Sequence, residues 1–399
     1  MADFARSTHP AVQSQLDRLS KLSPGGDQLG LDRISRVLER LGRPQDQLPP
    51  IFHVAGTNGK GSTCAFLRAA IEGAGLQCHV FTSPHLVRFN ERIRISGKLI
   101  NDALLAELLA EVLDSSGGIE PSFFEVTTAV AFLAFARIPA DACILEVGLG
   151  GRLDATNVID RSLVCGIAAL GVDHEQFLGS ELAGIATEKA GISRLGVPLV
   201  SLAQHPEAEA AIESACEETG APLLLEGRDW QLDSRLRPGL PGYHQVRNAN
   251  LAWQMLAAQK HVTVSSAAFR RAIAKTRWPG RFQRIGPATW VDGAHNPAAA
   301  SALAETLAQT GPMHIILGIL ANKNADEIVR LLRPYALSLT FVPVADHPHH
   351  DPETLAERFG GTVSVSLAEA LTTISQPRLI AGSLYLVGAA LAQVGEELD

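Results

Sequence analysis

The chain has 399 residues, of which 46% are hydrophobic, 19% charged and 5% aromatic. This length predicts two or three domains, and the composition excludes a disordered or collagen-like chain. With 34 basic and 42 acidic residues the net charge is -8, which argues against a nucleic-acid groove. A local basic site for a small anionic ligand remains open.

The cysteines and apolar stretches indicate where the protein resides. The five cysteines are odd in number and none forms a C-x-x-C pair, so neither a disulfide framework nor a zinc knuckle is predicted. The longest apolar stretch, Val126 to Ala136, is too short to span a bilayer. Residues 1–6 do not resemble the start of a signal peptide. These features predict a cytoplasmic protein that does not associate with a membrane.

Short apolar runs alternate with segments of helical spacing along most of the chain. The first run, residues 51–54, meets a glycine-rich turn that leads into a helical segment at 63–72. Similar runs are found at 142–147, 163–169, 197–201, 289–292, 314–318, 339–344 and 378–382. This alternation predicts an α/β fold with mostly parallel sheets, in which ligands bind at the carboxyl ends of the strands.

Proline and glycine interrupt the helical spacing between Thr276 and Pro287, and a new strand follows directly. We therefore place one domain at residues 1–285 and a smaller, Rossmann-like α/β domain at residues 286–399. Residues 223–243 begin with an apolar run and continue as a loop, which predicts a small β-rich insertion in the larger domain.

Residues 55–63, Ala-Gly-Thr-Asn-Gly-Lys-Gly-Ser-Thr, lie between a predicted strand and a predicted helix. Glycines allow successive backbone N–H groups to turn toward a phosphate, and the helix N-terminus adds partial positive charge. Val54 stands where the general G-x-x-x-x-G-K-[ST] pattern has its first glycine, so this is a variant phosphate loop. Its predicted nucleotide-binding residues are Gly56, Thr57, Asn58, Gly59, Lys60, Gly61, Ser62 and Thr63.

Three further residues are candidates for chemistry, although each has an ordinary structural explanation when taken alone. Glu146 ends an apolar strand, where its carboxylate could hold Mg²⁺ beside Ser62 or simply be solvated. His174 follows another apolar strand, and a single histidine is more often structural than functional. Lys189, next to Glu188, has the pattern of a surface charge on a helix.

The motifs resemble, in order, those of the folylpolyglutamate synthase/dihydrofolate synthase family of the Mur ligase superfamily. The phosphate loop has that superfamily's form, Gly-Thr-Asn-Gly-Lys-Gly-Ser, and the resemblance extends from Leu29 to Ser383. The other landmarks are residues 83–92, 146–157, 173–174, 188–192, 279–283 and 292–297. The resemblance implies an enzyme in which ATP phosphorylates a carboxylate, the amine of glutamate attacks the acyl phosphate, and phosphate leaves.

The resemblance also implies site residues. Lys60, His174 and Lys189 would be catalytic, and Lys189 would be carbamylated so that it offers oxygen to a metal. Two Mg²⁺ ions would be held by Ser62, Ser83, Glu146, His174 and Lys189. Further ATP contacts would come from Asn248, Arg281, Asp292 and His295, so that domain closure completes the site.

A dihydropteroate pocket is implied as well. Its residues would be Leu29, Leu31, Arg88, Ser122, Phe124, Asp154 and Ala155. In this pocket Asp154 would hydrogen-bond the amino-pyrimidine edge of the pterin, and Phe124 would stack on its face.

Three C-terminal segments carry weaker signals. Gly382-Ser383 is expected to form a strand-to-helix turn near the nucleotide. Residues 346–351, Asp-His-Pro-His-His-Asp, contain metal-ligand types, but the prolines favour an exposed loop. Lys323 is flanked by asparagines where the family has aspartates, which leaves any role of its loop in glutamate or cation binding open.

We therefore expect a monomeric, ATP- and Mg²⁺-dependent ligase that acts on dihydropteroate, folates and L-glutamate and binds neither nucleic acid nor membrane. The nearest alternative is a monofunctional folylpolyglutamate synthase. A ligase of nucleotide-linked muramyl peptides is disfavoured because the phosphate loop begins as early as Ala55. A non-catalytic nucleotide-binding switch would have no use for Glu146, His174 and Lys189.

Overall fold

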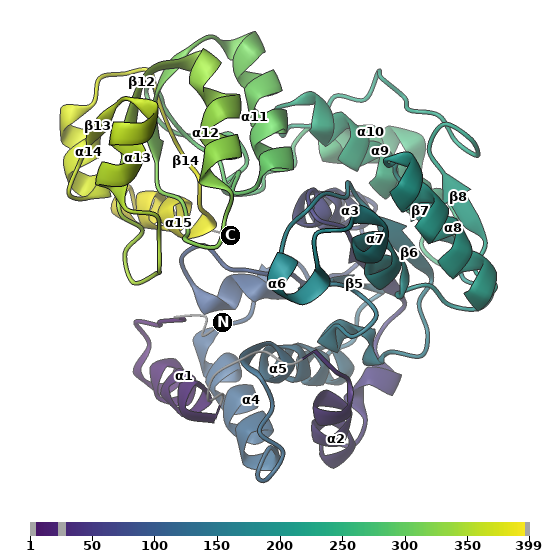
Figure 1. Cartoon of the computed structure of the whole chain (residues 1–399). Coiled ribbons are helices and arrows are strands. Elements are labelled where there is room, and N and C mark those ends of the chain that lie inside the picture. Colours follow the sequence, from purple (N-terminus) through teal and green to yellow (C-terminus); the bar gives the residue numbers. More distant parts are fainter. Residues whose placement is uncertain (1–4, 23–28, 396–399) are drawn as a thin grey trace. The chain divides into compact units, whose positions relative to one another are not determined.

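The structure is a computed structural model that describes residues 5–22 and 29–395. Most of residues 1–6, on which the signal-peptide prediction rests, lie outside that description. The chain divides into two compact units (Figure 1). Unit 1 comprises Met1–Pro238 and Val246–Thr276, and unit 2 comprises Gly239–Gln245 and Arg277–Leu398. Residues 277–285, which the sequence placed in the first domain, thus cluster with unit 2.

Unit 1 contains an eight-stranded sheet in the order β4-β3-β2-β5-β1-β6-β7-β8. Strands β2, β5, β1, β6, β7 and β8 run parallel, and β3 and β4 add antiparallel strands at one edge. Their bounds are β1 (Ile51–Ala55), β2 (Cys78–Phe81), β3 (Ile93–Ile95), β4 (Lys98–Leu99), β5 (Ala142–Glu146), β6 (Val164–Ile167), β7 (Leu199–Ser201) and β8 (Leu223–Leu225). Every residue of β1 and β5 is buried, because helices cover both faces of the parallel part.

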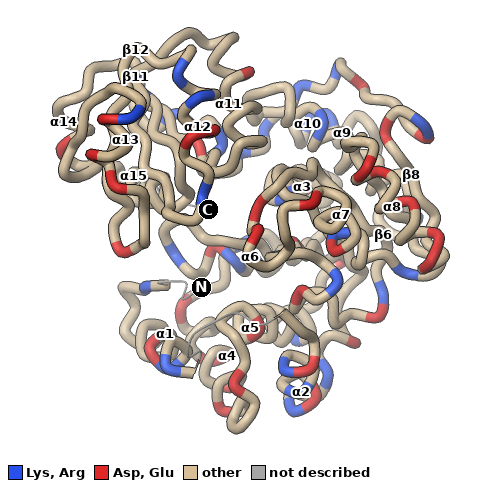
Figure 2. Tube along the Cα trace, in the orientation of Figure 1, with Lys and Arg blue, Asp and Glu red and all other residues tan. Residues whose placement is uncertain are grey.

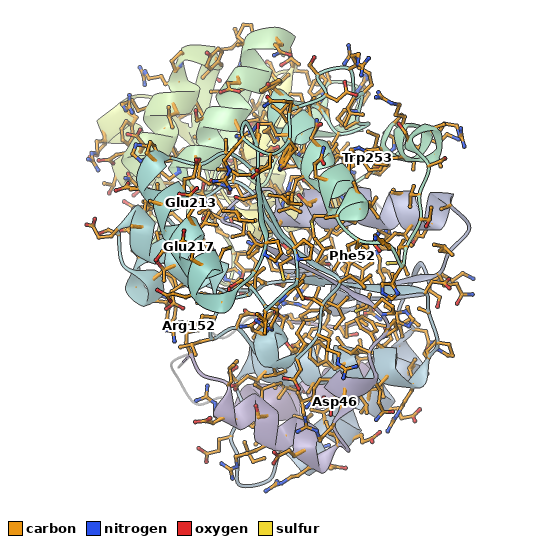
Figure 3. The ribbon with its side chains drawn as sticks, turned by 90° about the vertical axis from the view of Figure 1, so that its right-hand side faces the viewer. Asp46, Phe52, Arg152, Glu213, Glu217 and Trp253 are labelled. Carbon is orange, nitrogen blue, oxygen red and sulfur yellow. The ribbon has the colours of Figure 1, made fainter. Side chains whose placement is uncertain are left out.

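Alternate side chains of β1 point to opposite faces of the sheet, so their packing shows which helices of unit 1 cover which face. Ile51 packs in the core of α1, α2, α4 and α5, and Ala55 packs in the core of α7 and α8, so these helices share one face of the sheet. Phe52 points to the other face and lies deep among side chains (Figure 3). The bounds are α1 (Pro10–Leu22), α2 (Asp32–Arg40), α3 (Lys60–Gly73), α4 (Asp102–Ser115), α5 (Phe123–Arg137), α6 (Glu175–Leu178), α7 (Leu182–Ala190), α8 (Pro206–Thr219), α9 (Tyr243–Ala257) and α10 (Ser266–Ile273).

Unit 2 contains a six-stranded sheet in the order β13-β12-β11-β14-β10-β9, in which only β9 is antiparallel to its neighbour. The strands are β9 (Gln283–Gly286), β10 (Thr289–Val291), β11 (Met313–Leu317), β12 (Ala336–Phe341), β13 (Thr362–Val363) and β14 (Arg378–Ala381). The helices are α11 (Pro297–Thr310), α12 (Ala325–Leu332), α13 (Pro352–Phe359), α14 (Leu367–Thr373) and α15 (Leu384–Gln393). The predicted fold class is confirmed: a larger, mostly parallel α/β unit carries the phosphate loop, and a smaller Rossmann-like α/β unit follows.

The predicted β-rich insertion at residues 223–243 is wrong. Within this stretch one strand forms, β8, and it is the last strand of the main parallel sheet. The apolar run 223–225 therefore has an ordinary sheet position. The loop that follows is held by Asp233, whose carboxylate pairs with Arg235 and Arg270.

The surface and the cysteines agree with the composition. Helix α2 carries charges of both signs, whereas α8 carries acidic residues only (Figure 2). All five cysteines are buried and unpaired with one another. In the part of the chain that the structure describes, each helix is too short or too polar to cross a membrane.

Candidate active site

The phosphate loop joins the end of β1 to the start of α3. Gly56 has φ 146° and Gly59 has φ 87°, conformations that favour glycine. The backbone N–H groups of Thr57 and Asn58 both donate to the carbonyl of Ala169, at 2.9 and 3.0 Å. The loop is thereby tied to the segment that follows β6, so its shape is fixed by the sheet.

Asn248 of α9, which the resemblance implies as an ATP contact, lies against this loop. A side chain at position 59 would collide with the Asn248 carboxamide, so the close approach requires Gly59. The Lys60 Nζ donates to the carbonyls of Gly56 and Thr57, at 3.0 and 3.4 Å. The ammonium group is therefore held over the loop where phosphates would bind.

Glu146 ends β5, the strand beside β1, in register with Val54. Its carboxylate is 4% exposed and accepts a hydrogen bond from the Ser83 backbone N–H at 3.2 Å. Burial raises the pKa of the Cys64 thiol on α3, Glu146 raises it further and Lys60 lowers it. Glu146 therefore lies near the first turns of α3, which include the buried Ser62.

Lys189 lies in the last turn of α7 and is 5% exposed, unlike a surface lysine. Burial, followed by repulsion from Lys60, lowers the pKa of Lys189 to about 7, while Asp173 and Asp154 oppose the shift. His174 is the residue directly before α6 and has φ 54°. Its backbone N–H donates to the Asp173 carboxylate at 2.8 Å. The structure thus brings the predicted Lys189 close to the phosphate-loop lysine.

The loop after Glu146 packs against, and hydrogen-bonds to, the end of α7 that carries Lys189. A side chain at Gly151 would lie 2.6 Å from the Glu188 carbonyl and 2.9 Å from the Lys189 Cα. Arg152 donates through its backbone N–H to the Glu188 carbonyl and through its guanidinium to the Glu188 carboxylate, both at 2.7 Å. Asn157 donates to the Gly191 carbonyl at 3.1 Å. The glycine-rich motif therefore positions Lys189.

Two of the residues predicted to bind the pterin, Ser122 and Phe124, lie at the start of α5. Ser122 and Glu125 form a capping box, and the Phe124 ring lies directly on the Gly148 backbone, which leaves no room for a side chain there. Phe124 also packs against Phe81, with ring centroids 5.8 Å apart. Arg33, two residues after the predicted Leu31, donates to the Glu125 carboxylate at 3.0 Å, a contact that the sequence did not predict.

The other predicted pocket residues occupy different environments. Leu31 packs at the margin of the core beneath α5, and Ala155 is buried in that core. Leu29 is half-buried, and the Arg88 guanidinium reaches Asp102 at 3.2 Å. Their contact with a pterin stays a prediction.

Asp154 is 2% exposed, and its carboxylate is fully engaged by its own loop. One oxygen accepts from the N–H groups of Gly148 and Leu149, at 3.0 and 2.9 Å. The other accepts from the backbone N–H and the hydroxyl of Thr156, at 2.9 and 2.5 Å. Four donors fill the usual acceptor positions of a carboxylate. A direct contact of Asp154 with a pterin stays a prediction.

In unit 2 the structure brings Arg281, Asp292 and His295 together around Gly293. A side chain at Gly293 would lie 2.7 Å from the Arg281 guanidinium, and the His295 ring bonds the Gly293 carbonyl at 2.7 Å. The Asp292 carboxylate accepts from the Phe282 and Ala294 N–H groups, both at 2.8 Å. Burial raises the pKa of Asp292, and Arg281 opposes the shift.

The two remaining C-terminal predictions concern turns of unit 2. Gly382 and Ser383 form the predicted strand-to-helix turn, and Ser383 caps α15. The histidines at 346–351 lie in a loop, where His350 bonds the Lys323 carbonyl at 2.8 Å. Within the described ranges no three His, Cys, Asp or Glu side chains gather as a metal site.

The predicted metal ligands fit Mg²⁺ unequally. Ser62, Ser83 and Glu146 offer oxygen, which Mg²⁺ prefers. His174 and an unmodified Lys189 offer nitrogen, which suits Mg²⁺ poorly. Addition of CO₂ to the Lys189 amine would give a carbamate, whose oxygens are suitable ligands for Mg²⁺. A buried amine with a lowered pKa is chemically suited to that modification.

Residues 280–391 match the family model described as Mur ligase, glutamate ligase domain. The chain is 35% identical over 347 residues to the Bacillus subtilis dihydrofolate synthase/folylpolyglutamate synthase, covering 78% of this chain and 80% of that protein. It is similar to the Escherichia coli FolC structure in complex with DHPP and ADP, with a TM-score of 0.88, 31% identity, and coverage of 97% and 98% of the two chains.

A third similarity adds a different set of ligands. The crystal structure of a bifunctional folylpolyglutamate synthase/dihydrofolate synthase with Mn, AMPPNP and L-glutamate bound matches with a TM-score of 0.87 and 30% identity, over 98% of this chain and all of that one (100%). With this identity and coverage, the chain belongs to the dihydrofolate synthase/folylpolyglutamate synthase family of Mur-type ATP-dependent ligases.

Proposed function

We propose that this protein is a bifunctional, ATP-dependent ligase. It joins L-glutamate to dihydropteroate and adds further γ-linked glutamates to tetrahydrofolate. The observation that carries the proposal is the grouping of the phosphate loop, Glu146 and the buried Lys189 near the carboxyl ends of β1 and β5. A nucleotide-binding switch would need the loop but not the other two.

The chemistry follows from these groups. A carboxylate oxygen of the acceptor attacks the γ-phosphorus of ATP and ADP leaves, which gives an acyl phosphate. The amine of glutamate then attacks the acyl carbon, and phosphate departs with one oxygen of the original carboxylate. Lys60 and the phosphate-loop N–H groups stabilise the charge that develops on the phosphoryl oxygens.

We assign two Mg²⁺ sites to the enzyme, with Ser62, Ser83 and Glu146 at the first and His174 and carbamylated Lys189 at the second. Bound divalent ions offset charge on the transferring phosphoryl group. The protein's own contribution is to bury Lys189 beside Lys60, which keeps much of the amine neutral near pH 7 and so able to react with CO₂.

The remaining assignments concern the residues that bind the nucleotide and the pterin, the cellular location and the oligomeric state. Asn248 in unit 1 and Arg281, Asp292 and His295 in unit 2 bind the nucleotide. The surroundings of Phe124 receive the pterin. The enzyme acts as a cytoplasmic monomer on small molecules, without nucleic acid.

Phosphate release by the purified protein with MgATP and glutamate tests the proposal. Dihydropteroate, tetrahydrofolate and a nucleotide-linked muramyl peptide are compared as acceptors. Release with the first two supports the bifunctional assignment, and release with tetrahydrofolate alone reduces it to a folylpolyglutamate synthase. Turnover of the muramyl peptide alone would refute the folate assignment.

A further inference from the structure

His53 is a buried histidine that the proposed chemistry does not use. It lies in the middle of β1, three residues before Gly56, and is fully buried. Its Nε2 lies 2.9 Å from the Thr156 hydroxyl, while Nδ1 is buried without a hydrogen-bond partner. A buried, half-satisfied imidazole is costly, so its single contact calls for an explanation.

That contact is the first link of a hydrogen-bond chain with a defined direction. The Thr156 hydroxyl has one hydrogen, which it donates to the Asp154 carboxylate at 2.5 Å. The hydroxyl oxygen can then only accept from His53, so His53 carries its proton on Nε2. Burial lowers the pKa of His53 to about 3, so the ring is neutral and its single N–H is the one on Nε2.

At its other end, this series of hydrogen bonds reaches the turn that follows Glu146. Asp154 accepts from the N–H groups of Gly148 and Leu149, and the Phe124 ring rests on Gly148. The phosphate loop is instead held by Ala169 and approached by Asn248, on separate contacts. A change at Thr156 should therefore disturb the surroundings of Phe124 more than the nucleotide site.

We propose that His53 and Thr156 are positioning residues that fix Asp154, and through it the Gly148–Leu149 turn, in the geometry that binds the pteroate acceptor. The inference rests on the proposed function, because it assigns the acceptor site to the surroundings of Phe124. It adds two residues that do not touch the acceptor themselves.

Thr156→Val tests the hydrogen-bond series from His53 to Asp154, because valine keeps the shape of threonine and removes the hydroxyl. We expect the KM for dihydropteroate to rise about tenfold, the loss typical of a buried hydrogen bond to a charged group, with the KM for ATP changed less than about twofold. Thr156→Ser, which restores the hydroxyl, should recover most of the affinity. Likewise His53→Gln, which keeps an N–H donor, should outperform His53→Leu.

Thr306→Val is the matched control, since Thr306 is also buried and its hydroxyl donates within α11 of unit 2 to the Ala302 carbonyl. It should leave the KM for dihydropteroate unchanged. Binding of dihydropteroate in the presence of ADP, measured by calorimetry, reports the same differences without turnover.

The inference is wrong if Thr156→Val leaves the KM for dihydropteroate unchanged, raises both KM values equally, or is not rescued by Thr156→Ser. A wild-type protein that neither binds nor ligates dihydropteroate would overturn the proposed function, and this inference with it. An active wild type with an unaffected Thr156→Val would overturn this inference alone.

Discussion

At Lys189, burial and repulsion from Lys60 outweigh the opposing effect of two nearby carboxylates, Asp173 and Asp154. Its amine therefore loses its proton near pH 7 rather than near the pH where exposed lysines do. Since CO₂ reacts with the neutral amine, carbamate formation should increase as the pH rises through about 7. We expect a carbon-13 carbamate signal from protein equilibrated with labelled bicarbonate, growing over that range and absent from Lys189→Ala.

The same variant tests the function of the group. Lys189→Ala should lose ligase activity and regain part of it with a short-chain carboxylate, which can supply the missing oxygen ligand. Phosphate release with dihydropteroate measures both effects. Normal turnover by Lys189→Ala would refute the carbamate assignment.

Gly59 shows how closely the phosphate loop is packed. Gly59→Ala places a side chain at φ 87° and against the Asn248 carboxamide, so we expect a loss of more than about 1 kcal/mol in the free energy of unfolding together with a large loss of ATP affinity. Gly75→Ala is the matched control, because Gly75 has φ 83° at the other end of α3 but nothing within 4 Å. Denaturant unfolding and ATP titration compare the two variants. Equal ATP affinities of the two would contradict the assignment of Gly59 to the nucleotide-binding loop.

Single residues also show what sequence alone could not reveal. The pattern around Lys189 is that of a surface charge, and its burial became visible only when the loop carrying Gly151 and Arg152 was placed over α7. The family motif named Asp154 without showing that its four acceptor positions are filled from Gly148, Leu149 and Thr156. Such contacts join segments far apart in sequence and have no local signal.

At the scale of elements, helix α5 depends on its N-terminal cap. Ser122→Ala should cost about 1 kcal/mol of unfolding free energy and raise the KM for dihydropteroate, because α5 carries Phe124. Ser265→Ala removes an equivalent cap from α10, where the Ala268 N–H donates to Ser265 at 3.2 Å, the same length as from Glu125 to Ser122. It should cost similar stability, measured by denaturant unfolding, and leave that KM unchanged. Equal KM changes would show that α5 has no special relation to the acceptor.

Elements with a strong apolar pattern were predicted and weakly patterned ones were not. Strands β1 and β5 are fully buried, so their continuous apolar runs identified them. Strand β9 is polar and only partly buried at the edge of its sheet, and it was taken for linker. Residues 223–225 were misassigned because an apolar run does not reveal which sheet it joins.

At the scale of the whole molecule, the proline and glycine interruption between Thr276 and Pro287 predicted two α/β units, and the structure has two. Their boundary differs from the predicted one because β9 pairs with β10 and so clusters with unit 2. The net charge of -8 gives anionic substrates no general attraction, so local groups such as Lys60 and the phosphate-loop N–H groups must bind them.

The assignment of Arg281 to the nucleotide predicts that unit 2 contributes to ATP binding. Arg281→Ala should raise the KM for ATP about tenfold, the equivalent of about 1.4 kcal/mol, and reduce the rise in unfolding temperature that MgATP produces. Arg277→Ala changes an exposed arginine of the same segment and should do neither. Identical behaviour of the two variants would refute the assignment.

The central claim is that a carboxylate is activated as an acyl phosphate before glutamate attacks it. Dihydropteroate whose carboxylate carries oxygen-18 tests this most directly when it is incubated with the enzyme, MgATP and L-glutamate. Mass spectrometry of the products should find dihydrofolate together with inorganic phosphate that has gained one oxygen-18 atom per amide formed. Phosphate without the label, or hydrolysis of ATP without dihydrofolate, would contradict the claim.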